Sequence, residues 1–122
     1  MITKEITYTD FNGNKRTEKF YFNLSKAEIT EMELGETGGM SQKLERIVES
    51  QDNKEIVAIF KEIILKAYGE KSEDGRRFMK SKERAKAFEE TEAYSVLFME
   101  LVQNEDAAAA FINGIIPQDV RP

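Results

Sequence analysis

The beginning of the chain alternates apolar and polar residues with a period of two. Apolar side chains recur on one side of two expected strands: Ile2, Ile6 and Tyr8, then Phe20 and Phe22. Because alternate strand residues point to opposite faces, this spacing predicts two half-buried strands over residues 1–22. Asn12 and Gly13 between them tolerate a positive φ, which predicts the turn of a β-hairpin. A lone hairpin is marginal in water, so it either packs on helices or pairs with a second copy of the chain.

Helical spacing begins at Ser25. Ser25 and Glu28 fit a capping box, and Leu24 and Ile29 are placed as a hydrophobic staple, so a helix is expected to start here and end near Gly35. A second short helix is predicted by one apolar face: Met40, Leu44, Ile47 and Val48.

A stronger helix is expected after Asp52, which is placed as its N-cap. Its apolar face is continuous: Ile56, Ile59, Phe60, Ile63, Ile64 and Ala67. Gly69 fits the stop of this helix, and the polar residues 69–75 predict a loop.

Three more helices are predicted in the last third of the chain. They cover residues 82–90, residues 92–103, and a segment capped by Asn104 that runs through the alanines to Ile112. Asn113-Gly114 predicts the end of the last helix. Together these elements predict a single domain over residues 1–122 of the α+β class, mostly α. It has a β-hairpin over 1–22, five or six short helices over 23–122, and no strand after residue 22.

The composition excludes several kinds of chemistry. The chain has 122 residues, 18 basic and 23 acidic, a net charge of −5, and neither Cys nor His. Disulfides and thiolate catalysis are therefore excluded, and the usual general base and commonest metal ligand are missing. The acids Glu28, Glu31 and Glu33 lack the alternating ligands and central Gly of a calcium loop. We expect no cofactor, no metal site and no enzymatic activity.

The charges are unevenly distributed. Six basic residues and one acid, Glu83, lie in residues 76–86: Arg76, Arg77, Lys80, Lys82, Arg84 and Lys86. This run is either a solvated helix face or a surface that docks on an acidic partner. The negative net charge and the single aromatic residue of the run, Phe78, argue against nucleic acid as a partner. No apolar run is long enough to span a bilayer and no signal peptide opens the chain, so we expect no membrane contact and a cytosolic location.

The segment over residues 92–103 is apolar on two sides. Its main stripe consists of Tyr94, Leu97, Phe98, Leu101 and Val102, whereas Val96 and Met99 project to the other side. Such a helix is either sandwiched in the core or carries a second face for a partner. Phe111, Ile115 and Ile116 lie near the chain end, where they either fold back on the core or extend that face. The candidate partner-binding residues are therefore Val96, Met99, Phe111, Ile115 and Ile116.

Residues 74–117 resemble the tail assembly chaperones of long-tailed, siphovirus-type bacteriophages and prophages. The resemblance is carried by four strings: DGRRF at 74–78, FEETEAY at 88–94, LFMEL at 97–101 and AAFINGIIP at 109–117. It implies a non-enzymatic protein of the bacterial cytoplasm that is not part of the mature virion. The implied partners are the tape measure protein and the tail tube protein. The resemblance supplies no catalytic residues. A small phage or bacterial adaptor that regulates by protein–protein docking stays open as the alternative.

Overall fold

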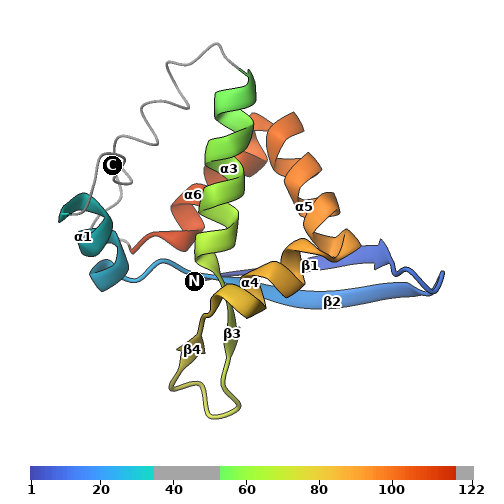
Figure 1. Ribbon diagram of the computed structural model, residues 1–122, viewed down its shortest axis with the longest axis horizontal. Coiled ribbons are helices and arrows are strands. Elements are labelled where there is room, and N and C mark those ends of the chain that lie inside the picture. The colour runs from blue at the N-terminus through green and yellow to red at the C-terminus, as the bar shows by residue number, and fades with distance from the viewer. Residues whose placement is uncertain (35–52, 118–122) are drawn as a thin grey trace.

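The computed structural model describes residues 1–34 and 53–117 (Figure 1). The expected helix over 40–48, the helix end near Gly35 and the Asp52 cap lie outside the described residues. β1 (Ile2–Thr9) pairs antiparallel with β2 (Lys15–Phe22), from Ile2 opposite Phe22 to Thr9 opposite Lys15. Gly13 adopts a φ of 83° in the connecting turn, and its N–H donates to the Asp10 carbonyl at 3.0 Å. The predicted hairpin is confirmed, and so is the positive φ that the turn requires of Gly13.

The sheet does not end with the hairpin. β3 (Tyr68–Lys71) and β4 (Phe78–Met79) extend it in the order β1-β2-β3-β4. β3 pairs with β2 at two positions, Gly69 opposite Tyr21 and Tyr68 opposite Phe22. The prediction that strands stop at residue 22 is therefore wrong, and so is the division into a hairpin over 1–22 and a purely helical remainder.

Gly69 has a different role from the one its sequence context indicated. It lies within β3, directly after the preceding helix ends at Ala67. A Cβ placed on Gly69 would lie 2.5 Å from Cε2 of Phe78, so the absence of a side chain lets the Phe78 ring close on the strand. The segment 69–75 is thus a strand followed by a turn, not a loop throughout.

Five helices occur in the described part of the chain: α1 (Lys26–Leu34), α3 (Asn53–Ala67), α4 (Lys82–Glu89), α5 (Glu92–Gln103) and α6 (Glu105–Ile115). The capping box of α1 is confirmed, because the Glu28 N–H donates to Ser25 Oγ at 3.1 Å and the Ser25 N–H donates to Glu28 Oε1 at 2.9 Å. Asn104 caps α6 by accepting from the Ala107 N–H at 3.0 Å.

The last helix continues past its expected stop. α6 runs through Asn113 and Gly114 to Ile115. A Cβ on Gly114 would lie 2.9 Å from Cδ1 and 3.2 Å from Cβ of Ile2, so Gly114 allows β1 to approach the helix closely. The Leu24 N–H also donates to the Ile115 carbonyl at 2.8 Å, which ties the helix end to the segment after β2.

An aromatic cluster forms the centre of the core. Phe22 at the end of β2 is fully buried, and its ring centroid lies 5.6 Å from that of Phe88 in α4 and 5.3 Å from that of Phe111 in α6. Tyr68 of β3 stacks on Phe88 at 4.4 Å. α5 and α6 lie against β1, so one face of the hairpin is covered. The other face is polar and its β1 residues are exposed: Thr3, Glu5, Thr7 and Thr9.

Lys80 links three separate segments beside this core. Its Nζ donates to the Asn23 carbonyl at 2.7 Å, to Glu28 Oε2 at 2.6 Å and to the Lys66 carbonyl at 2.9 Å. These acceptors belong to the segment after β2, to α1 and to the end of α3. Burial raises the pKa of the Glu28 carboxyl, but hydrogen bonds from Lys80 and Ser25 lower it by more, so that pKa lies below its ordinary value.

Replacing Lys80 by Met should destabilise the protein by about 2 kcal/mol, because the Glu28 carboxylate and two carbonyls lose a charged donor. Urea unfolding followed by circular dichroism measures the loss. Lys82→Met is the matched control, since Lys82 is exposed at the start of α4, and its effect should stay below about 0.5 kcal/mol. Equal losses in the two variants would contradict the role given to Lys80.

The stability difference between the wild-type protein and Glu28→Gln should depend on pH. A carboxyl whose folded pKa is depressed stabilises the fold above its unfolded pKa of about 4.3 and loses this effect as the pH falls through the folded value. The wild-type protein should therefore be the more stable one at pH 7, and the difference should shrink in acid. Unfolding curves for both proteins across this range test it, and a difference that does not change with pH would contradict the Lys80–Glu28 contact.

Candidate partner-binding surface

α5 presents two different faces. The helix starts at Thr91, whose Oγ1 accepts from the Tyr94 N–H at 3.3 Å. One face consists of buried residues that pack on the core: Ala93, Leu97 and Leu101. An ion pair of 3.2 Å between Lys4 Nζ of β1 and Glu100 Oε1 fixes the helix to the sheet. α5 therefore has one face buried against the core and one exposed face.

Val96 and Met99 lie on this outer face. Their side chains are 42% and 44% exposed, and at a spacing of i, i+3 they are neighbours on the helix surface. The structure thus places these two candidates where a partner could reach them. Isolated apolar residues are common on protein surfaces, so the exposure alone does not define a binding site.

Phe111, Ile115 and Ile116 lie elsewhere. They are only 1%, 0% and 3% exposed and belong to the core. Of the two alternatives for these residues, they fold back on the core, because α6 lies along β1 and the Leu24 N–H donates to the carbonyl at its end. Their placement among the partner-binding candidates is corrected by this burial. The five candidates are therefore not brought together, and only Val96 and Met99 are accessible.

The core position of Phe111 gives a clear expectation. Phe111→Ala should destabilise the protein by about 4 kcal/mol, because it leaves a cavity beside the Phe22 ring. The matched control is Phe11→Ala in the hairpin turn, where the same truncation removes a side chain that is 77% exposed. Thermal unfolding of both variants measures the difference. A small effect at Phe111 would show that this residue does not hold α6 to the sheet.

The basic run over 76–86 does not form one free patch. Arg76 and Arg77 are exposed in the turn between β3 and β4. Lys80 is engaged in the contacts described above, and Arg84 Nε pairs with Glu70 Oε1 at 2.6 Å. The run is divided among a turn, a strand end and a helix, and two of its cations stabilise the fold itself.

The titratable groups near α5 offer little for catalysis. Lys61 Nζ of α3 lies 2.9 Å from Glu89 Oε2, and this hydrogen bond raises the pKa of Lys61. Burial raises the pKa of Tyr94. Both shifts move the pKa values of these groups further from neutral pH, so neither group gains a role in proton transfer there.

Within residues 1–34 and 53–117, no group of three or more acids is placed to hold a metal ion. None of the helices in that part of the chain has the length and apolar character to cross a membrane.

Comparison with known families decides the identity of the chain. The family model described as "Phage tail assembly chaperone" matches residues 1–122, which is the whole sequence. The chain belongs to this phage tail assembly chaperone family. The resemblance carried by residues 74–117 is thus confirmed and extends to the hairpin. The comparisons find no similar curated protein and no similar solved structure.

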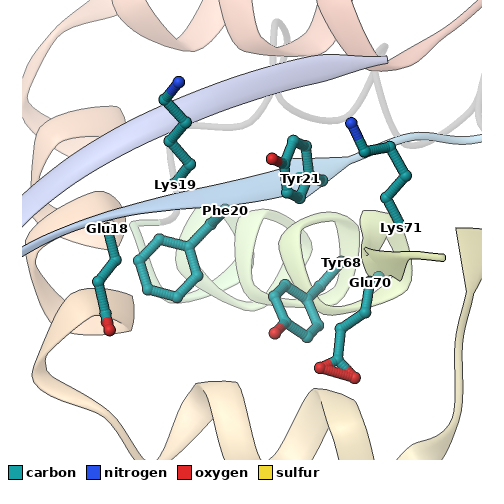
Figure 2. Close-up of a pocket in the computed structure, with 8 residues that line it drawn as sticks. Glu18, Lys19, Phe20, Tyr21, Tyr68, Glu70 and Lys71 are labelled. Atoms are coloured by element: carbon teal, nitrogen blue, oxygen red, sulfur yellow. The ribbon is translucent and has the colours of Figure 1, made fainter. Parts of the chain in front are cut away.

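The chaperone has a second surface feature that the sequence did not indicate. A groove opens where β3 diverges from β2, and residues from both strands line it (Figure 2). The sequence pattern could not reveal it, because residues 69–75 were interpreted as a loop. The signal in the sequence is that both segments place a Glu-Lys pair close to aromatic residues, EKFY at 18–21 and YGEK at 68–71.

Proposed function

We propose that this family member is a non-enzymatic chaperone that binds the tape measure protein in the bacterial cytoplasm and assists the polymerisation of tail tube subunits around it. The family match over the whole chain carries the proposal. Val96 and Met99 on α5 are the residues that we place in the partner-binding face.

The chemistry of this face suits a long helical partner. An apolar pair at i, i+3 on a rigid helix can lie along an apolar stripe of another helix. The flexible side chain of Met99 adapts to different neighbours, which helps a small protein bind many sites along one chain. Each contact covers little area and is therefore weak, so assembling tube subunits can displace it.

The charge of the chain supports the same role. A net charge of −5 keeps copies of the chaperone apart and maintains solubility while they cover an aggregation-prone partner. Many weak contacts along a single partner add up through multivalency without any contact being tight. Membership of the family supports a non-enzymatic role, which needs no group that titrates near neutral pH.

Val96→Ser combined with Met99→Gln should weaken capture of purified tape measure protein about tenfold or more, because the apolar contact is lost. The thermal midpoint should stay nearly unchanged, since both side chains are exposed. Binding is measured by titration against tape measure protein and, separately, against tail tube protein.

Val57→Ser is the matched control, because Val57 is a 41% exposed valine on a different helix, α3. It should leave binding unchanged. Unfolding of the double variant would identify Val96 and Met99 as structural residues. Full-strength binding by the folded double variant would place the partner face elsewhere.

A further inference from the structure

The outer edge of β2 is paired along only part of its length. β2 pairs with β1 at every residue from Lys15 to Phe22, but with β3 only at Tyr21 and Phe22. In Figure 1 the hairpin continues well beyond the point where β3 leaves it. Residues 15–20 therefore have a neighbouring strand on the β1 side and none on the other side within the described chain.

The register shows which backbone groups face this open side. The Asp10 N–H donates to the Asn14 carbonyl at 2.8 Å, which marks that pair as hydrogen-bonded. Because such pairs alternate in an antiparallel ladder, the peptide groups of Lys15, Thr17, Lys19 and Tyr21 point away from β1. The pairing of Tyr21 with Gly69 agrees with this assignment. The outward N–H and C=O groups of Lys15, Thr17 and Lys19 thus form a row beside the last β3 contact that no strand of residues 1–34 and 53–117 pairs with.

Side chains of opposite character border this open edge. Lys19, Tyr21 and Lys71 project to one face of the sheet, and Phe20 and Tyr68 project to the other, as Figure 2 shows. Lys15 shares the face of Lys19, because alternate residues of a strand point the same way. One face of the open edge is therefore basic, whereas the other carries two half-buried aromatic rings together with Glu18 and Glu70.

The basic side chains lack acidic partners, whereas the acidic side chains of the groove are already engaged. In the described part of the chain neither Lys15 nor Lys19 forms an ion pair, although Glu5 lies across the ladder from Lys19. By contrast, Glu70 pairs with Arg84 at 2.6 Å, and Glu18 accepts from the Tyr8 hydroxyl and lies 3.5 Å from Arg16 Nη1. The groove therefore favours acidic side chains from a partner, and on one face only.

We propose that the open edge of β2 takes up an extended segment of another protein as an added strand. The outward peptide groups of Lys15, Thr17 and Lys19 bond its backbone. On one face of the added strand, acidic side chains lie over Lys15 and Lys19. On its other face, apolar side chains lie over Phe20 and Tyr68. This surface shares no residue with the α5 face, and its use does not depend on that face.

A second copy of the chain fits this edge poorly. Antiparallel self-pairing centred on Thr17 would set Lys15 of each copy opposite Lys19 of the other, and like charges directly opposite each other are destabilising. Self-pairing centred on Glu18 would place the two Glu18 side chains opposite each other. A segment that alternates acidic and apolar side chains has neither conflict.

Two labelled peptides test the charge preference, one that alternates Glu and Val and one that alternates Lys and Val. The protein of residues 1–122 should bind the acidic peptide at least about tenfold more tightly than the basic one, because each charge beside Lys15 or Lys19 changes from attractive to repulsive. Lys19→Glu should reduce or reverse this preference. Failure to bind either peptide, or equal binding of both, would overturn the proposal.

A pair of matched proline variants tests the strand addition. Thr17→Pro removes an N–H group that points outward from β2, and it keeps the hydrogen bonds between β1 and β2. Thr7→Pro removes an N–H group that points outward from β1, at the opposite edge of the hairpin, and keeps the same hydrogen bonds. Both lose the same hydrogen bond of 2.9 Å between the hydroxyls of Thr7 and Thr17. Thr17→Pro should weaken binding of the acidic peptide about tenfold, and Thr7→Pro should not.

Equal effects of the two prolines, or an effect of Thr7→Pro alone, would place the binding edge elsewhere. If Thr17→Pro fails to fold, the reduced or reversed charge preference of Lys19→Glu decides the question. Sedimentation of the wild-type protein and both proline variants measures self-association, which tests whether a second copy of the chain binds the edge instead. Self-association that only Thr17→Pro abolishes would make a second copy the occupant and overturn the proposal.

Discussion

The burial of Phe22 joins the hairpin to the rest of the molecule. A two-stranded hairpin has too little buried surface to be stable alone, so it needs a neighbouring element to cover one face. Phe22 provides this connection at the end of β2, where its ring meets Phe88 of α4, Phe111 of α6 and Tyr68 of β3. Elements that lie far apart in the sequence thus share one aromatic cluster.

Local signals in the sequence predicted local structure correctly. The Ser25–Glu28 capping box, the Asn104 cap and the turn at Gly13 are all formed by bonds between residues a few positions apart. The predictions failed where a residue serves a distant neighbour. Gly69 and Gly114 resemble helix stops, yet the first makes room for Phe78 and the second for Ile2. Without the tertiary contact, a glycine needed for close packing cannot be distinguished from one that ends a helix.

The difference between local signals and distant contacts also explains which features of the candidate site could be predicted. Helical periodicity alone sets Val96 and Met99 on the side of α5 opposite Leu97 and Leu101, and the structure leaves those two side chains exposed. For Phe111, Ile115 and Ile116, the place near the end of the chain allows either a fold back onto the core or an exposed face. Position in the sequence does not determine burial, and α6 carries them onto the sheet. The open edge of β2 depends on β3, so it could not be predicted before β3 was known.

The two surfaces use different physical interactions. The proposed α5 face consists of two apolar side chains, so its contacts with a partner would be weak and would change little with salt. The β2 edge combines directional backbone hydrogen bonds with exposed lysines, whose attraction to an acidic segment is screened as ionic strength rises. The Lys4–Glu100 ion pair holds α5 against β1, and β1 is in turn paired along its whole length with β2. The two proposed surfaces therefore belong to one folded unit and share no residue, so partners at the two surfaces would not compete for the same contacts.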